Sequence, residues 1–156
     1  MTTSTTEVRK AAPKDIDTLY NLIQMYAEQG IMLPRSRDLL QRQLDDFVVA
    51  ELDGEVVGCG SLCQLGPDLV EIRSLGISDG HKGHGIGTKL IDFLVDEARK
   101  RNIPKVMALT YAVHFFEKNG FSVVQKDIFP EKVWKDCIHC KKQHCCDEIA
   151  VLKSLK

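Results

Sequence analysis

The dipeptide Asp53-Gly54 lies between two β-rich runs, at residues 47–52 and 55–65, and is the feature that most constrains the fold of this 156-residue chain. Asp-Gly supplies the positive φ angles that a tight hairpin turn requires. The two runs are therefore predicted to pair as an antiparallel β-hairpin. A second turn at residues 66–68 leads into a strand at residues 69–78, so the middle of the chain is predicted to form a sheet.

Strands and helices are predicted on both sides of this hairpin. A strand at residues 7–11 precedes a helix that Gly30 ends, and a second helix is expected from its N-cap Ser36 to about residue 45. Beyond a glycine-rich segment, the expected elements are a helix at 87–100, a strand at 106–109, a short helix at 113–118, and strands at 121–124 and 149–152.

Length and composition are typical of one soluble globular domain, with 44% hydrophobic and 28% charged residues. Residues 1–156 are predicted to form a single domain, with residues 1–6 disordered and residues 130–147 an irregular cysteine-containing insertion. The formal net charge of -1 favours neither nucleic acid nor a membrane as partner. The chain start lacks the parts of a signal peptide, and no stretch approaches the roughly 20 apolar residues that span a bilayer. A cytoplasmic location is therefore expected.

The glycine-rich segment at residues 75–88 runs from a strand into the start of a helix. Gly83, Gly85 and Gly87 allow backbone N–H groups to point toward one place, where the helix dipole adds partial positive charge. Three basic side chains can supplement that charge: His81, Lys82 and His84. This pattern favours a phosphate site; the alternative is a flexible loop with a glycine-rich helix cap.

Two common phosphate-binding motifs do not fit this segment. A dinucleotide-binding fold needs Gly-x-Gly-x-x-Gly near the first strand and an acidic residue about 20 residues later, and a P-loop ends in Gly-Lys-Ser/Thr. This loop follows a hairpin and a further strand, and it ends in Gly85-Ile86-Gly87-Thr88.

The run Lys82-Gly83-His84-Gly85-Ile86-Gly87 resembles the acetyl-CoA loop Arg/Gln-x-x-Gly-x-Gly/Ala of the GCN5-related N-acetyltransferase (GNAT) superfamily, with lysine at the first position. The order of elements is also similar across most of the chain. The resemblance implies an α/β (α+β) GNAT fold. Its central sheet would be mixed and mostly antiparallel, with six or seven strands and about four helices, and would splay at the acetyl-CoA site.

The resemblance also implies that acetyl-CoA is the co-substrate. Its pantetheine arm would pair with the backbone of Leu75, Gly76 and Ile77, and its pyrophosphate would meet the loop that continues to Thr88. Backbone N–H groups would polarise the acetyl carbonyl as the amine attacks. Binding would then orient the two reactants directly.

Four segments look like the acetyltransferase domain of N-acetylglutamate synthases, namely residues 30–37, 71–75, 108–111 and 129–136. The chain resembles their short, free-standing bacterial form, without the amino-acid-kinase-like domain of the longer form. This resemblance implies acetylation of the α-amino group of L-glutamate, a step of arginine biosynthesis. The alternatives are a GNAT enzyme for another small amine and a catalytically idle CoA-binding or zinc-binding regulatory module. A homodimer is compatible with the sequence.

Attack requires a neutral amine, so a general base near the site is useful. Glu71, on the strand before the glycine-rich segment, is the candidate, and the family's central-strand carboxylate maps onto it. The alternative for Glu71 is an exposed carboxylate that pairs with Arg73 or a lysine. A glutamate pocket must also bind two carboxylates, which favours arginine, and Arg35 and Arg73 meet that need. Arg37 is more readily a solvated helix-start residue.

Thr110 matches a hydroxyl position near the reaction centre in the resembled family, or it caps the helix that follows. Many superfamily members have a tyrosine where this chain has Phe116, and that tyrosine protonates the leaving CoA thiolate. The general acid here is therefore Tyr111, a water or none, since a thiol pKa of about 8.5 makes the thiolate a ready leaving group.

Four cysteines and two histidines fall between Cys137 and Cys146, and a zinc site can be assembled from them. Adjacent Cys145 and Cys146 disfavour joint coordination, and the alternative is a folded surface loop with reduced thiols. Cys59 and Cys63 are expected to be buried strand residues.

Overall fold

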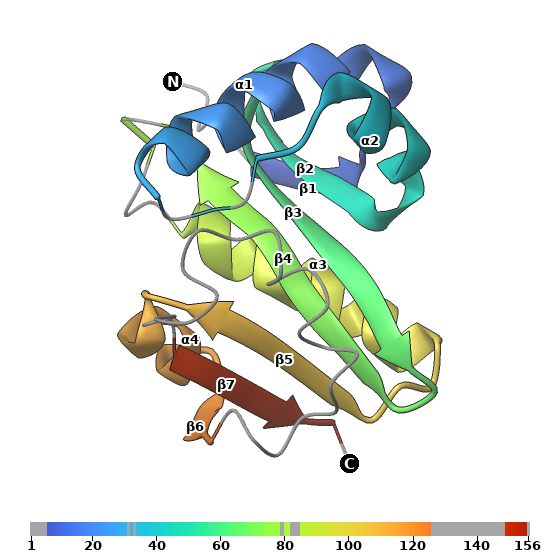
Figure 1. Cartoon of the computed structure of the whole chain (residues 1–156), viewed down its shortest axis with the longest axis vertical. Coiled ribbons are helices and arrows are strands. Elements are labelled where there is room, and N and C mark those ends of the chain that lie inside the picture. Colours follow the sequence, from blue (N-terminus) through green and yellow to red (C-terminus); the bar gives the residue numbers. More distant parts are fainter. Residues whose placement is uncertain are drawn as a thin grey trace. The chain divides into compact units, whose positions relative to one another are not determined.

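The computed structural model describes residues 6–30, 32, 34–78, 80–81, 85–125 and 149–155. The strands are β1 Thr6–Lys10, β2 Phe47–Leu52, β3 Glu55–Gly66, β4 Leu69–Ile77, β5 Lys105–Thr110, β6 Ser122–Val124 and β7 Ile149–Ser154. The helices are α1 Ile16–Glu28, α2 Arg37–Arg42, α3 Ile86–Lys100 and α4 Val113–Lys118 (Figure 1). Strand β1 begins at Thr6, inside the segment expected to be disordered, whereas residues 1–5 and the insertion at 130–147 lie outside the described residues.

The strands form one seven-stranded sheet in the order β1-β2-β3-β4-β5-β7-β6. The pairs β1/β2, β2/β3, β5/β7 and β6/β7 are antiparallel, and β4/β5 is parallel. The β4/β5 pairing runs from Leu69↔Lys105 to Glu71↔Met107, and both strands continue past it. The mixed, mostly antiparallel sheet with four helices confirms the predicted fold class.

The hairpin at Asp53-Gly54 has the predicted geometry. Asp53 has a φ of 52° and Gly54 a φ of 82°, and Leu52 pairs with Glu55 directly across the turn. Both residues occupy the left-handed region that a tight turn between twisted strands requires. The local sequence is therefore sufficient to specify this turn.

The chain divides into two compact units, residues 1–62 with 72–97 and residues 63–71 with 98–156. In the first unit, α1 packs against the sheet through Leu19 and Ile23, in a cluster that includes Cys59 of β3. Gly58 and Gly60 of β3 lie under side chains of α3, which a Cβ at either position would crowd at 3.2 Å. Since successive strand residues face opposite sides, α1 and α3 cover opposite faces of β3.

The second unit is built on β5, which has β7 as its antiparallel neighbour (Figure 1). Its core includes Leu65, Met107 and Ala150. Helix α4 ends at Lys118, two residues before Gly120, whose φ is 91°, and the ring of Phe116 packs edge-to-face on Phe121 at a centroid distance of 5.1 Å. These contacts attach α4 to the sheet edge.

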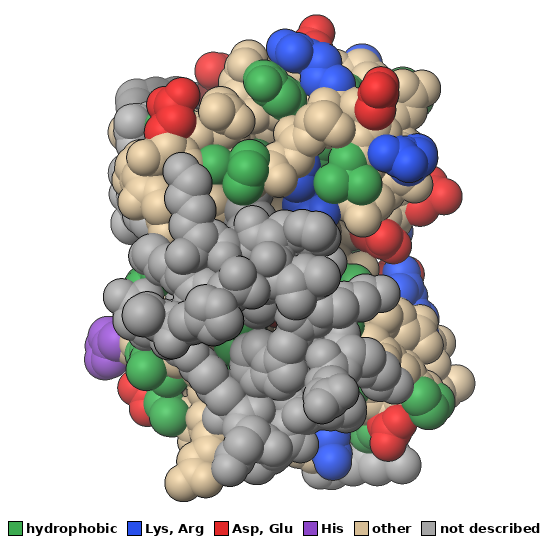
Figure 2. Space-filling view, viewed as in Figure 1, with side chains coloured by type: hydrophobic (Ala, Val, Ile, Leu, Met, Phe, Trp, Pro, Cys, Tyr) green, Lys and Arg blue, Asp and Glu red, His purple; other side chains and the backbone are tan. Residues whose placement is uncertain are grey.

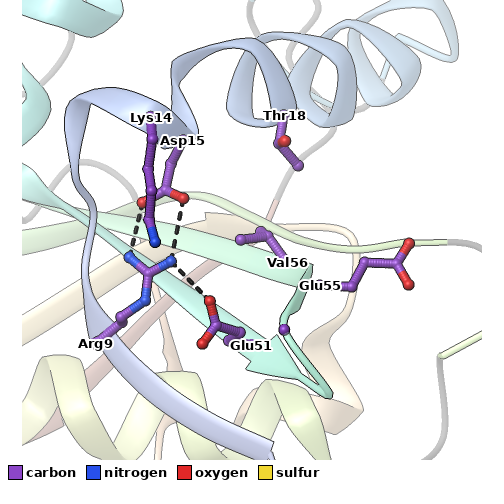
Figure 3. Close-up of a pocket in the computed structure, with 8 residues that line it drawn as sticks. Arg9, Lys14, Asp15, Thr18, Glu51, Glu55 and Val56 are labelled. Carbon is purple, nitrogen blue, oxygen red and sulfur yellow. Dashed lines mark hydrogen bonds and ion pairs between the residues drawn. The ribbon is translucent and has the colours of Figure 1, made fainter.

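An ion pair between half-buried Arg9 and buried Asp15 joins β1 to the start of α1 (Figure 3). Arg9 donates to both carboxylate oxygens of Asp15, at 2.7 and 3.1 Å, and to Glu51 of β2 at 3.0 Å. Asp15 also accepts the N–H of Ala12 at 2.7 Å. Burial alone would raise the pKa of Asp15, but the hydrogen bonds from Arg9 and Ala12 and the positive charge of Arg9 lower it overall.

Asp15→Asn is therefore expected to lower the free energy of unfolding by about 2 kcal/mol at pH 7, because a charge-assisted contact of a buried carboxylate is lost. A carboxyl with a lowered folded-state pKa stabilises the fold above its unfolded pKa of about 3.9 and loses that effect as pH falls through the folded value. The difference between wild type and variant should therefore shrink below about pH 4. Urea titrations at several pH values measure it.

The control is Asp17→Asn, which breaks an exposed ion pair with Arg37 and should change stability by about 0.5 kcal/mol or less. Equal losses for Asp15→Asn and Asp17→Asn would contradict the importance of the pair between Arg9 and Asp15.

Candidate active site

The described part of the glycine-rich segment includes the start of α3. Gly85 has a φ of 79°, and a Cβ built there meets nothing within 4 Å. Its carbonyl accepts the N–H of Lys89 at 3.2 Å, so Gly85 directly precedes α3, whose first residue is Ile86. The first N–H groups of a helix have no partner within the helix, and they form a site for an anion. Lys82, Gly83 and His84 lie outside the described residues.

The residues after Gly85 differ in what they can offer a ligand. Ile86 is 2% exposed, so its side chain belongs to the core and only its backbone can meet a ligand. Gly87 lies in the first turn of α3, and Thr88 is exposed. The His81 ring lies beside Ser78, with Nδ1 2.9 Å from the hydroxyl oxygen.

On the face of the molecule shown in Figure 2, positively and negatively charged side chains of the described residues are interspersed. A pocket of about 380 Å³ on the first unit contains Arg9, Asp15 and Glu51, whose charges are already paired with one another (Figure 3). The charged residues of this pocket therefore form a network that stabilises the fold. A polyanionic ligand would need a local site such as the start of α3.

Gly85→Asp is expected to weaken acetyl-CoA binding by more than about tenfold, because its carboxylate would repel the pyrophosphate and its side chain would fill the open space above the backbone. Calorimetry on the folded variant measures this. Gly54→Asp is the matched control, since Gly54 has the same positive φ and an equally open Cβ position but lies in the hairpin turn. Unchanged affinity in Gly85→Asp, or an equal loss in Gly54→Asp, would contradict the assignment of the loop.

The backbone of β4 at Ile77 is hydrogen-bonded to a side chain of α1, a contact that the sequence did not predict. The Tyr26 hydroxyl donates to the Ile77 carbonyl at 2.8 Å and accepts from the Ile77 N–H at 3.1 Å. A Cβ on Gly76 would lie 2.7 Å from the Tyr26 ring, so only glycine fits there. A cofactor arm that pairs with Ile77 has to share these backbone groups with Tyr26 or displace its hydroxyl.

Strand β4 is distorted at Ser74, whose φ of 54° is in the left-handed region. Two side chains of β3 donate to carbonyls here: Cys59 Sγ to Ser74 at 3.3 Å and Ser61 Oγ to Arg73 at 3.0 Å. Such a conformation costs free energy in a non-glycine residue and persists where neighbouring groups enforce it. Burial raises the pKa of the Cys59 thiol to about 12, which keeps it a protonated donor at neutral pH.

The structure distinguishes the two candidate arginines near the start of α2. Arg35 is half-buried and reaches the distortion of β4, where its Nε donates to Ser74 Oγ at 3.2 Å. Arg37 is exposed, pairs with Asp17 at 2.9 Å and lies 4.0 Å above the centroid of the Tyr20 ring. The interpretation of Arg37 as a solvated helix-start residue is confirmed.

The remaining candidates lie on or beside β4 and β5. Glu71 is 6% exposed, so the alternative of an exposed strand carboxylate is wrong. Its neighbours Val70 and Ile72, which face the other side of the sheet, are buried too, so both faces of β4 are covered at this point. Arg73, two residues after Glu71, is half-buried. Thr110 is buried, and its hydroxyl oxygen accepts the N–H of Ala112, the N-cap of α4, at 2.8 Å. Tyr111 is 40% exposed.

Among the cysteines, Cys59 is fully buried as predicted, whereas Cys63 is only half-buried, at a position of β3 that is less well covered than those of Leu62 and Leu65 on either side of it. The cluster from Cys137 to Cys146 lies outside the described residues. Among the residues that are described, no group of three or more His, Cys, Asp or Glu side chains is arranged to hold a metal ion.

No described helix is long and apolar enough to cross a membrane.

Comparison with known proteins gives consistent results. The model of the acetyltransferase (GNAT) family matches residues 15–121. An uncharacterized N-acetyltransferase of Chlorobaculum tepidum is 35% identical over 155 residues, which are 99% of this chain and 100% of that protein. An amino-acid acetyltransferase of Mycobacterium tuberculosis is 36% identical over 121 residues, covering 76% of this chain and 69% of that protein.

Among solved structures, N-acetylglutamate synthase from Neisseria gonorrhoeae, complexed with coenzyme A and N-acetyl-glutamate, superposes with a TM-score of 0.87. The match has 29% identity and covers 97% of this chain and 35% of that chain. The fold, the helix start after Gly85 and the family match over most of the sequence agree with one another. The chain therefore belongs to the GNAT family and is an acetyl-CoA-dependent N-acetyltransferase.

Proposed function

We propose that this enzyme acetylates the α-amino group of L-glutamate. The observation that carries the proposal is the setting of Arg35, a half-buried guanidinium that Ser74 and Gln43 hold against the distorted segment of β4. A guanidinium binds a carboxylate through parallel, charge-assisted hydrogen bonds, and fixing it in advance lowers the entropy lost on binding. Arg73, one residue before Ser74, is the candidate partner for the second carboxylate.

The relatives support the same acceptor class. The M. tuberculosis relative is an amino-acid acetyltransferase, and the N. gonorrhoeae structure contains both coenzyme A and N-acetyl-glutamate. N-acetyl-glutamate is the product that acetylation of glutamate would yield. We therefore assign this chain the same reaction and, with it, a role in arginine biosynthesis.

The proposed reaction is a direct transfer. Glu71 takes a proton from the α-ammonium group, directly or through a water, and the neutral amine bonds to the acetyl carbonyl carbon. The carbon–sulfur bond breaks and the CoA thiolate leaves, while the second amine proton passes to solvent or to the thiolate. Tyr111 is the candidate donor of a proton to sulfur, and Thr110 is the candidate hydroxyl beside the reaction centre. Phe116 is buried against Phe121 and has no proton to give.

The start of α3 fits the other substrate. Acetyl-CoA carries a pyrophosphate, which matches the helix N–H groups after Gly85 and the open space above that glycine. The phosphate end of the substrate would therefore be held by backbone groups and the dipole of α3.

A thiol-release assay over a panel of free amino acids tests the acceptor. L-Glutamate should have the highest kcat/KM, and glutamine and aspartate should each be about 10- to 150-fold lower, because each loses a charge-assisted contact. Arginine, lysine and polyamines should be very poor acceptors, since their cationic groups would meet the same guanidinium groups. A cationic or apolar amine that outperforms glutamate would refute the glutamate assignment and leave the acetyltransferase assignment intact.

A further inference from the structure

Two successive carbonyls of β4 accept hydrogen bonds from side chains of β3. Ser61 Oγ donates to the Arg73 carbonyl at 3.0 Å, and Cys59 Sγ donates to the Ser74 carbonyl at 3.3 Å. In a regular strand the carbonyls of successive residues point to opposite sides. Here both point toward β3, and the positive φ of Ser74 is the backbone irregularity that permits this arrangement.

The N–H groups of the same two peptide bonds point the other way. A trans peptide is planar, with its N–H opposite to its C=O, and none of the described peptide bonds is cis. The N–H groups of Ser74 and Leu75 therefore both point away from β3. Successive N–H groups on one side of the chain, next to a residue in the left-handed region, form a concave pair of donors that suits an oxyanion.

The altered peptide orientation is confined to a short part of β4. The Ser78 N–H donates to the Val57 carbonyl of β3 at 2.8 Å, so regular pairing with β3 has resumed there. Ile77, one residue earlier, directs its N–H and its carbonyl to the Tyr26 hydroxyl. The reoriented peptides therefore lie before Ile77, in the part of β4 that follows its pairing with β5.

The two donors of β3 are suited to holding this arrangement. Ser61 is 4% exposed and Cys59 is fully buried, so water does not readily replace either group. Burial raises the pKa of the Cys59 thiol to about 12, which keeps its proton in place at neutral pH. A buried carbonyl that loses its donor costs free energy, so both side chains favour the observed direction of the β4 peptides.

We infer that Ser61 and Cys59 are positioning residues for acyl transfer. By holding two carbonyls of β4 toward β3, they present the N–H groups of Ser74 and Leu75 to the carbonyl oxygen of the acetyl thioester. That oxygen gains negative charge as the amine attacks, and donors that are fixed in advance stabilise it without reorganisation. The inference requires acetyl-CoA but no particular acceptor, so it goes beyond the glutamate proposal and does not depend on it.

The double variant Cys59→Ala/Ser61→Ala tests the inference, because it removes both donors. The expected result is a fall in kcat of about tenfold or more. Affinity for acetyl-CoA should fall by about fivefold, whereas affinity for CoA, which lacks the acetyl carbonyl, should stay within about 1.5-fold of wild type. Thiol release with the best acceptor of the wild type gives kcat, and calorimetry with each ligand gives the affinities without any acceptor.

Three single variants serve as controls. Cys59→Ser retains a donor and should keep kcat within about twofold of wild type, whereas Cys59→Ala should lower it by about threefold. Val57→Ala shortens another buried side chain of β3 without removing a donor. It should lower the melting temperature and leave the ratio of the affinities for acetyl-CoA and CoA unchanged.

Three results would overturn the inference. The first is a folded double variant with wild-type kcat, and the second is an equal loss of kcat in Cys59→Ser and Cys59→Ala. The third is a parallel loss of affinity for acetyl-CoA and CoA, which would mark the two residues as merely structural. If the double variant does not fold, Ser61→Ala is judged by the first and third results, with an expected fall in kcat of about threefold. Failure of the glutamate proposal appears separately in the acceptor panel and leaves the calorimetric comparison unaffected.

Discussion

Glu71→Gln is expected to lower kcat by about 100-fold or more while leaving acetyl-CoA affinity nearly intact. Glutamine preserves the size of the side chain and its ability to hydrogen-bond but cannot take a proton from the amine. Glu71 is buried in β4, so loss of its carboxylate is poorly replaced by bulk water. Steady-state thiol release over pH 6 to 9 and calorimetric titration with acetyl-CoA measure the two quantities.

The control for this prediction is Glu55→Gln, which makes the same change at an exposed glutamate of β3. It should leave kcat unchanged. Thermal unfolding of Glu71→Gln shows whether the protein remains folded. A folded Glu71→Gln variant with wild-type kcat across this pH range would reduce Glu71 to a buried structural carboxylate and remove it from the reaction.

Arg35→Ala is expected to reduce kcat/KM for glutamate by about 10- to 150-fold, which corresponds to the loss of one charge-assisted contact of about 1.5–3 kcal/mol. The advantage of glutamate over glutamine should shrink with it. The KM for acetyl-CoA should change little, because the loop at Gly85 and not Arg35 is assigned to that substrate. The same acceptor panel, run on the variant, gives each of these values.

Arg37→Ala provides a close comparison, because Arg37 lies two residues away but is exposed and paired with Asp17. It should stay within about twofold of wild type. The assignment of Arg35 to the acceptor would fail if Arg37→Ala harmed glutamate turnover more, or if Arg35→Ala raised the KM of acetyl-CoA as much as that of glutamate.

Features that depend on neighbouring residues were predictable from the sequence. Asp53-Gly54 adopts the expected turn, Ser36 Oγ accepts the Leu39 N–H as an N-cap, and α4 begins and ends where the sequence predicts. The same holds for the order of the elements and for the glycine at the start of α3. Each of these is governed by backbone conformation or by hydrogen bonds between residues close in the chain. The family resemblance, carried by the same short segments, predicted acetyl-CoA.

Features that depend on distant segments appeared only in the tertiary structure. Arg35 and Ser74 are 39 residues apart, and Tyr26 and Ile77 are 51 residues apart, yet their contacts organise β4 where the candidate site residues lie. Cys63 also differs in burial from what was expected of it.

Local pattern specified which segments form strands and helices, because periodicity and turn chemistry act over a few residues. It did not specify that Gln43 would meet Arg35, that Tyr26 would bind the Ile77 backbone, or that Ser74 would adopt a positive φ. Those outcomes depend on packing between elements, in which a close approach at Gly76 and side-chain donors from β3 select one arrangement.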